Sequence, residues 1–180
     1  WCFITLFIVQ FAIKKNVINI IKYFFMNLEY INIYNNLVNL TRNKNLYKGF
    51  KKQDTFSDRL TFFLLHFAFF LTVFKKDNDK KSLQKIYDYL FRQLELSIRE
   101  IGYGDQSINK KMKDYLNLFY VMIDKLHEWK KLSKDQKTSL LKNFINKSAD
   151  HAFLVVYFNK YRLNLLNKTL NSYIKGVNKT

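Results

Sequence analysis

The scarcity of residues that turn the chain limits the possible folds more than any other feature of this sequence. It has no proline and only four glycines in 180 residues. Sandwiches and barrels built from strands need many tight turns, and those turns use both residue types. Apolar residues make up 48% of the chain, so it is not a disordered polymer despite its charge. The sequence therefore predicts a folded, helical protein.

Chain length and cysteine content narrow the class further. A chain of 180 residues fits one domain of ordinary size. Its single cysteine, Cys2, excludes a disulfide framework, a zinc site built on cysteines and an iron–sulfur cluster. No stretch of linker composition divides the chain, which indicates one domain.

The first residues form an apolar segment of doubtful status. Residues 1–13 are mostly apolar, and then Lys14 and Lys15 interrupt the run. Such a run is shorter than the roughly 20 residues that cross a bilayer core, and it lacks the flanks of a secretory signal. We expect translation to begin at Met26, with residues 1–25 outside the natural product and 26–180 forming the domain. A leader that touches a membrane is the alternative.

Beyond Met26, apolar residues recur at helical spacing and no segment alternates like a strand. This pattern predicts an all-α fold, a single bundle of about six helices. The expected helices run from about Leu28 to Arg42, Phe56 to Phe74, Leu83 to Ile101, Ser107 to Lys130, Lys134 to Phe144, and Asp150 to Ile174.

Several boundary residues support these helices. The pair at 54–55 is a good N-cap, Ser82 is expected to cap the following helix, and Ser133 with Gln136 forms a capping box. Gly102 stands just after the last apolar position of its helix, where a left-handed residue is favoured.

The segment Phe56–Phe74 is apolar on almost every side. Such a helix is either central in the core or covers another molecule. Arg59 and His66 interrupt it, so we do not interpret it as a membrane span. His66 is expected to be a core histidine with one hydrogen bond, whereas His127 and His151 are expected at the surface.

Signatures of enzymes are missing from the sequence. It has no glycine-rich phosphate loop, no HExxH and no paired-cysteine motif. We therefore expect no catalytic residue, no metal ion and no cofactor. The weaker alternative is an enzyme with a pocket inside the bundle, for which His66 and Arg59 are the nearby candidates.

The net charge of +17 has two interpretations. A basic surface attracts ribosomes and anionic lipid headgroups, and one alternative function is a basic ribosome- or RNA-binding helical module. However, lysine is abundant together with asparagine, isoleucine, phenylalanine and tyrosine, as codon bias in an AT-rich genome produces. Charge alone therefore does not identify a polyanion partner.

Residues 98–120 are the most informative stretch. Two of the four glycines, Gly102 and Gly104, fall in one turn between helices. Charged residues surround this turn: Arg99, Glu100, Asp105, Lys110, Lys111 and Lys113. Lysines in the first turns of a helix oppose its dipole, and a locally unfavourable choice indicates function. Lysine-rich codon bias and a structural ion pair between Arg99 and Glu100 remain the alternatives.

The R-E-x-G-x-G-D turn, followed by I-x-K-x-M-K and then by Phe119-Tyr120, resembles the ubiquinol–cytochrome c chaperone family. The segment DTFSDRLTFFLLHF, with Arg59 and His66 at matching positions, is similar to a second family pattern. The resemblance covers about Tyr47 to Phe144. The chain departs from the family after Tyr120, where Val-Met replaces the usual Gly-Arg.

The resemblance implies a non-enzymatic chaperone that binds newly made cytochrome b and supports assembly of the ubiquinol–cytochrome c reductase (bc1) complex. It also implies a small partner subunit and the ribosome as further partners, and no specific DNA. The location would be the cytoplasm, peripheral to the inner membrane, or the mitochondrial matrix in a eukaryote.

A membrane-protein client needs an aromatic groove with a basic rim. We expect the Phe56–Phe74 helix and the 102–113 region to lie together and to form that surface. The candidate protein-binding residues are Arg59, His66, Arg99, Glu100, Gly102, Gly104, Asp105, Lys110, Lys111, Lys113, Phe119 and Tyr120.

Overall fold

A computed structural model describes residues 30–50, 55–75 and 79–174 of the chain. Within these ranges every regular element is a helix, which confirms the all-α prediction. A helix over residues 30–41 is followed by the short 3₁₀ helix η1 (Lys44–Tyr47), then α2 (Phe56–Phe74), α3 (Lys80–Glu100), α4 (Asp105–His127), α5 (Lys134–Lys142), α6 (His151–Leu166) and α7 (Leu170–Ile174). The doubtful leader and Met26 lie outside the described residues.

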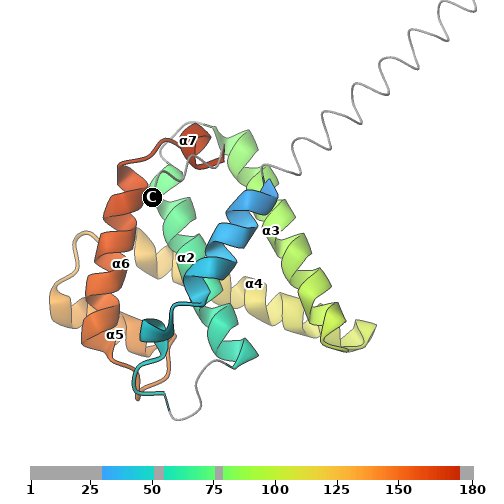
Figure 1. The fold of residues 1–180 in the computed structure, drawn as a ribbon, viewed down its shortest axis with the longest axis horizontal. Helices are drawn as coiled ribbons and strands as arrows, with labels where there is room; N and C mark the ends of the chain where they lie inside the picture. Colours follow the sequence, from blue (N-terminus) through green and yellow to red (C-terminus); the bar gives the residue numbers. More distant parts are fainter. Residues whose placement is uncertain (1–29, 51–54, 76–78, 175–180) are drawn as a thin grey trace, which may run out of the picture.

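Helix α2 stands in the middle of the bundle, with α6 on one side and α3 on the other (Figure 1). It packs against α4 and α6, and every residue from Phe62 to Phe70 is buried. Among the described residues, α2 is the one helix with the length and hydropathy of a membrane span. The apolar surface of α2 does not require a membrane, because neighbouring helices cover it. Of the two alternatives that the sequence leaves open for this helix, the structure therefore supports the central core helix.

Aromatic rings join α2 to the helices around it. Phe67 stacks on Phe119 of α4, with ring centroids 5.0 Å apart. Phe69 stacks on Phe158 of α6, also at 5.0 Å, and the edge of Trp129 meets the Phe69 ring at 5.1 Å. Such pairs contribute about 0.5–1.5 kcal/mol each beyond the area they bury. The phenylalanine-rich sequence of α2 is thus used for packing in several directions.

Three of the helix starts are where the sequence places them. Thr55 is the N-cap of α2, and its hydroxyl accepts the N–H of Asp58 at 3.2 Å. Asp150 caps α6 by accepting the N–H of Phe153. Both halves of the predicted capping box at the start of α5 are present. The first helix turns of α2, α5 and α6 are therefore fixed by local sequence.

The start of α3 and the end of α6 differ from expectation. The N-cap of α3 is Asp79, whose carboxylate accepts the N–H of Ser82, so Ser82 lies inside the helix. The predicted helix over 150–174 breaks after Leu166. Thr169 and Ser172 each donate a backbone N–H to the other's hydroxyl oxygen, at 3.1 and 3.2 Å, and this reciprocal pair begins α7 as a separate helix.

The boundaries of α4 also shift. It begins at Asp105 with Gly104 as its N-cap, two residues before the predicted start, and it ends at His127, three residues before the predicted Lys130.

The histidines are not all where the sequence suggests. His127 is exposed as expected, but His151 is only 5% exposed and the surface prediction is wrong for it. His151 is the first residue of α6, and its backbone N–H donates to the Ala149 carbonyl at 2.9 Å. This turn directs the ring inward, and burial lowers its pKa.

Candidate functional site

The α3–α4 turn carries most of the residues singled out in the sequence. Gly102 has a left-handed backbone (φ 97°), which confirms the predicted helix end. Its N–H donates to the Arg99 carbonyl at 2.9 Å. Gly104 has an ordinary φ of −72°, and a Cβ atom added there would meet nothing within 4 Å. The turn geometry therefore requires glycine at position 102 but not at 104.

Arg99 clamps this turn from α3. Its guanidinium donates to Glu95 Oε1 at 2.9 Å and to the carboxylate of Asp105, the first residue of α4. These two carboxylates, Glu95 first, raise the pKa of the Arg99 guanidinium. Its partners are therefore Glu95 and Asp105, not Glu100 as the alternative interpretation proposed. Exposed ion pairs add little stability, so this one mainly fixes the approach of α4 to α3.

Lysines follow the turn along α4. Lys111 Nζ lies 4.5 Å from the centroid of the Tyr103 ring, a cation–π contact. Lys110 and Lys113 are exposed, as is Glu100 on the other side of the turn. The turn thus presents the Tyr103 ring in contact with Lys111, followed by two further exposed lysines on α4.

Exposed apolar side chains are also concentrated on these two helices and their turn. Of the large hydrophobic residues that are exposed in the described part of the chain, this region carries Leu96, Ile101, Tyr103, Tyr120 and Val121. Apolar groups that stay in water next to cations are typical of protein contact surfaces.

Two predicted site residues lie inside the core. Phe119 is fully buried, stacked on Phe67 and in edge contact with Phe91 at 5.1 Å, so no partner can touch it. The neighbouring Tyr120 is 55% exposed. The pair that the sequence treats as one motif therefore divides into a core residue and a surface residue.

His66 is the second buried candidate. Its Nδ1–H donates to the Phe62 carbonyl at 2.6 Å, so its Nε2 accepts the hydroxyl of Tyr157 at 2.8 Å. It makes two hydrogen bonds where we expected one. Burial lowers the pKa of His66 to about 4, so the ring is neutral near pH 7. His66 connects α2 to α6 and does not reach the exposed α3–α4 turn.

Arg59, in the first turn of α2, lies near the C-terminal half of α3. It lines a pocket of about 170 Å³ together with Leu94 and Ser97, and Ser97 stands two residues before Arg99. The first turn of α2 and the last turns of α3 are therefore neighbours. This is the part of α2 that approaches the candidate residues.

A groove that the sequence did not reveal runs between α2, α3 and α4, with a volume of about 490 Å³. We call it the α2–α3–α4 groove. It is lined by Leu71, Thr72, Lys75, Lys80, Leu83, Gln84, Tyr87, Tyr120, Ile123 and His127. The hydroxyls of Tyr87 and Tyr120 are hydrogen-bonded at 2.8 Å, and burial first, then this bond, raises the pKa of Tyr87.

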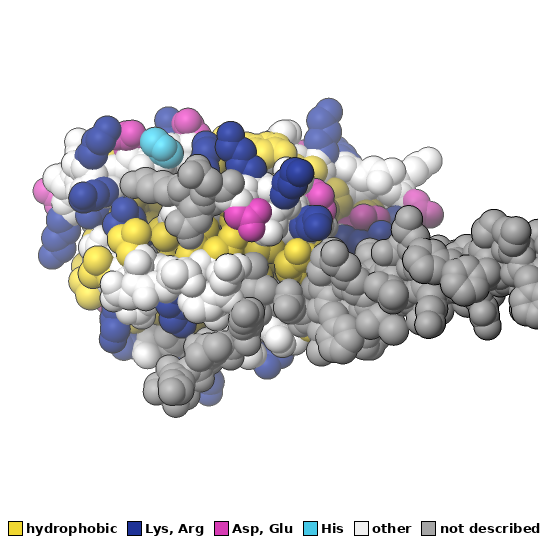
Figure 2. Space-filling model, turned by 90° about the horizontal axis from the view of Figure 1, so that it is seen from above, with side chains coloured by type: hydrophobic (Ala, Val, Ile, Leu, Met, Phe, Trp, Pro, Cys, Tyr) yellow, Lys and Arg dark blue, Asp and Glu magenta, His cyan; other side chains and the backbone are white. Residues whose placement is uncertain are grey.

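The surroundings of this groove are cationic. Lys75 and Lys80, at the end of α2 and the start of α3, are exposed. Figure 2 shows one face of the molecule, on which hydrophobic side chains form a band with uncharged polar groups, lysines and arginines beside it. The α2–α3–α4 groove therefore has two tyrosine rings in its lining, and exposed lysines stand at one end of it.

No group of three or more histidine, cysteine, aspartate or glutamate side chains in the described ranges is placed to hold a metal ion.

The fold is an all-helical bundle whose surface carries exposed aromatic and lysine side chains. The model of the family "Ubiquinol-cytochrome C chaperone" matches residues 48–170. Since this is more than half of the chain, the protein belongs to that family. The resemblance seen in the R-E-x-G-x-G-D turn is therefore confirmed.

A solved structure shares the fold. The crystal structure of the Cbp3 homolog from Brucella abortus superposes with a TM-score of 0.69 and 24% sequence identity, over 83% of this chain and 87% of that one. No curated protein matches the sequence.

Proposed function

We propose that this protein binds newly made cytochrome b and supports assembly of the bc1 complex without catalysing a reaction. The observation that carries the proposal is the family match over residues 48–170. The surface agrees with it, because a membrane-protein client offers apolar helices and charged loops.

The contact surface that we propose consists of the α3–α4 turn and the α2–α3–α4 groove, which lie toward opposite ends of α3. Tyr120 and the groove would take apolar side chains of the client, and the lysines after the turn would meet its polar loops. Arg59, Arg99, Glu100, Gly102, Gly104, Asp105, Lys110, Lys111 and Lys113 belong to this surface or to its frame. His66 and Phe119 hold the helices in place from inside the core.

The setting we propose is peripheral to the inner membrane, in the cytoplasm of a bacterium or the matrix of a mitochondrion. Exposed lysines favour an anionic membrane surface, and a client that enters a membrane is met there. A small partner subunit and the ribosome are the further partners in this proposal.

Site-specific photo-crosslinking tests both the client and the surface. A photoreactive residue at Tyr120 should crosslink to cytochrome b in cells, whereas one at the exposed Ser139 of α5 should not. Equal crosslinking from both positions would contradict the proposed surface. Recovery of ribosomal components without cytochrome b would instead support a ribosome- or RNA-binding module.

Deletion of the gene tests the biological role independently. We expect loss of assembled bc1 complex and of its quinol-oxidising activity in membranes. A fully assembled, active complex in the deletion strain would contradict the proposed function.

A further inference from the structure

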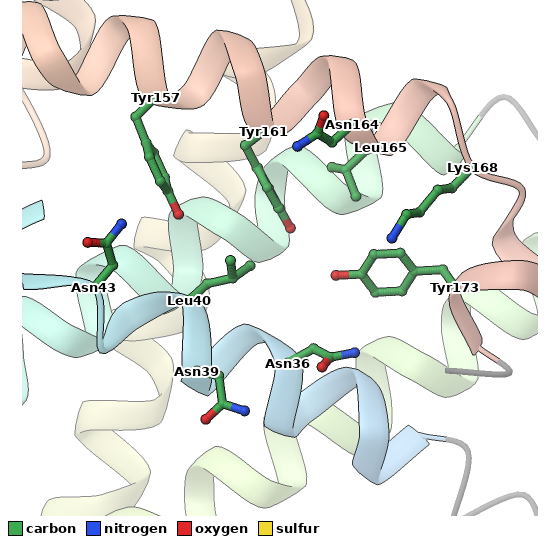
Figure 3. A pocket seen from close by; sticks show the side chains of 10 residues that line it. All are labelled: Asn36, Asn39, Leu40, Asn43, Tyr157, Tyr161, Asn164, Leu165, Lys168 and Tyr173. Atoms are coloured by element: carbon green, nitrogen blue, oxygen red, sulfur yellow. The ribbon is translucent and has the colours of Figure 1, made fainter. Parts of the chain in front are cut away.

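Helix α6 is apolar on its outer side as well as on the side that packs into the bundle. Figure 1 shows α6 at the edge of the molecule opposite α3, and it packs against α2 and α5. Toward the interior, a second groove of about 440 Å³ lies between α6 and the helix over residues 30–41, with Tyr157 and Tyr161 pointing into it from α6 (Figure 3). The side of α6 that faces away from the core is exposed to solvent.

The exposed side carries apolar residues at the spacing of one helix face, with successive steps of four and three residues. We call it the α6 outer face, and it consists of Ala152, Val156, Asn159, Leu163 and Leu166. Val156 is 61% exposed and Leu163 is 58% exposed, the two highest values among the large exposed hydrophobic residues in the described ranges. Apolar side chains that protrude together in this way mark an interaction surface.

Lysines border the α6 outer face on more than one side. Lys160 is exposed in the middle of the helix. On the side of α5, Lys137 Nζ lies 3.3 Å from Asn159 Oδ1. On the side of the loop after η1, Lys48 Nζ lies 5.6 Å from the centroid of the Phe153 ring. Three different segments of the chain therefore bring a cation to the margin of this face.

Carboxylates are absent from the last part of the sequence. Residues 151–180 contain no aspartate or glutamate, whereas their cations are Lys160, Arg162, Lys168, Lys175 and Lys179. On the adjoining elements, the carboxylate of Asp150 accepts the N–H of Phe153 at the helix start, and Asp135 stands in the first turn of α5. The surroundings of the α6 outer face are thus mainly cationic, and they complement an anionic partner.

Exposed apolar residues on α3 and α4 have different neighbours. Leu96 is followed by Glu100 four residues later, and Val121 is followed by Asp124 three residues later. Residues at these spacings lie next to each other on a helix surface, and a carboxylate is repelled by an anionic surface. Charge as well as position therefore separates the α6 outer face from the proposed client surface.

Shape and charge together favour a lipid bilayer as the partner. Val156 and Leu163 protrude from a helix at the edge of the bundle, and they line neither of the two grooves. A second copy of this face would bring lysines close to lysines, which is unfavourable. A bilayer takes protruding apolar side chains at the boundary between headgroups and acyl chains, and anionic headgroups attract the lysines beside them.

We propose that the α6 outer face binds the surface of a membrane that contains anionic lipids. Val156, Leu163 and Leu166 enter the boundary between headgroups and acyl chains. Lys160 keeps its charge among the headgroups, because its long side chain can extend away from the apolar region. This inference rests on the proposed function for its setting beside the inner membrane, and it names the face and the lipid chemistry. Since α3 lies on the other side of α2 (Figure 1), the proposed client surface stays accessible.

Flotation of the full chain with lipid vesicles tests the partner. Vesicles of phosphatidylcholine alone are compared with vesicles in which part of this lipid is replaced by phosphatidylglycerol. We expect binding to the anionic vesicles to be about tenfold tighter or more, because each lysine near an anionic surface raises the affinity about fivefold.

Matched variants locate the binding. The double variant Val156→Gln, Leu163→Gln removes the two most exposed apolar side chains, and the control Leu96→Gln, Val121→Gln makes the same pair of changes on α3 and α4. We expect binding to anionic vesicles to weaken about tenfold or more in the first variant only, because it loses the apolar contact with the bilayer. All four positions are exposed, so both variants should keep unfolding midpoints close to that of the wild type. Both also keep residues 1–29, so a contribution of that apolar segment is common to them.

Four results would overturn the inference: no binding of the wild type to anionic vesicles, equally tight binding to neutral vesicles, equal vesicle binding by the two variants, or binding to washed cell membranes that is lost when the membrane proteins are digested. The last would show that an acidic protein, not lipid, covers the face. Recovery of cytochrome b in detergent is measured separately. If cytochrome b copurifies with the wild type, the proposed function stands whatever the vesicles show, whereas its absence contradicts the proposed function and leaves the lipid-binding face intact.

Discussion

At the scale of single residues, His66 is a titratable group that is enclosed by aromatic rings and hydrogen-bonded to residues of α2 and α6. Its ring contacts Tyr157, Phe158 and Tyr161 of α6 with centroids 4.9–5.5 Å away. A charged imidazolium in that place would lose its hydration and gain no carboxylate in return. The stability of the bundle should therefore depend on pH through this one side chain.

The pKa of His66 is about 4 in the native state and 6.5 when the chain is unfolded. The unfolded chain therefore binds the proton first as pH falls, so the free energy of unfolding is highest above pH 6.5 and declines toward pH 4. We expect a loss of roughly 2 kcal/mol between pH 7 and pH 5 from this group. Urea unfolding at both pH values checks it, with His66→Phe as the variant in which this part of the decline is absent. An identical decline in the variant would show that other groups are responsible.

Gly49 is a residue whose importance the sequence did not reveal. Its φ is +86°, and a Cβ atom there would lie 2.2 Å from the carbonyl oxygen of Ser148. Beside it, the Lys48 carbonyl accepts the N–H of Asp150 at 3.1 Å, so the loop after η1 is tied to the N-cap of α6. Only a glycine allows the two backbones to approach this closely.

Gly49→Ala should lower the free energy of unfolding by about 2 kcal/mol or more, since the strain of a positive φ adds to the backbone clash. Gly104→Ala is the matched control, because its φ is ordinary and the space around it is empty. We expect a change within about 0.5 kcal/mol there. Chemical denaturation of both variants measures the difference; similar losses would contradict the tight approach at Gly49.

At the scale of helices, the sequence predicted those helix starts that are determined by side chains close by in the chain. The caps at Thr55 and Ser133 are correct because a side-chain oxygen satisfies an N–H only three residues away. Asp79 was missed as a cap because Ser82 had the same chemistry three residues later. The break between α6 and α7 was missed because apolar residues continue at helical spacing across it.

The capping box of α5 gives a direct test at this scale. Ser133 accepts the Gln136 N–H at 3.3 Å and its own N–H donates to Gln136 Oε1 at 2.8 Å. Ser133→Ala should lower the free energy of unfolding by about 1 kcal/mol. Ser139→Ala, at an exposed position inside the same helix, should leave it nearly unchanged or raise it slightly, because alanine favours helix. Thermal unfolding of both variants measures the difference. Equal unfolding midpoints for Ser133→Ala and Ser139→Ala would contradict the stabilising role of the capping box.

At the scale of the whole molecule, the sequence predicted the architecture and the family but not the surfaces. Helical spacing alone indicates a bundle, and motifs in the α3–α4 turn, along α4 and in α2 identified the family. The two grooves, however, each combine side chains from at least three segments. Phe119 and Tyr120 are adjacent in sequence, but the first is buried and the second is exposed. Which of them is buried likewise depends on how α4 is rotated against α2.

The charge of the whole molecule separates client binding from attraction to polyanions. We expect recovery of cytochrome b with the purified protein to fall less than tenfold between about 50 and about 200 mM salt, because apolar contacts persist when charges are screened. Binding to nucleic acid through several phosphates would fall by about a thousandfold or more over that range. Quantitative pull-downs at both salt concentrations distinguish the two, and a steep loss of cytochrome b would contradict an apolar contact surface.

The central position of α2 has a consequence for the biosynthesis of the protein itself. Two helices that enclose it, α4 and α6, end at His127 and Leu166, so a ribosome exposes the phenylalanine-rich segment well before its walls are translated. During that interval the nascent chain displays a stretch with the hydropathy of a bilayer-spanning segment. A protein of this design is for a time as vulnerable to aggregation, and as attractive to insertion machinery, as a nascent membrane protein.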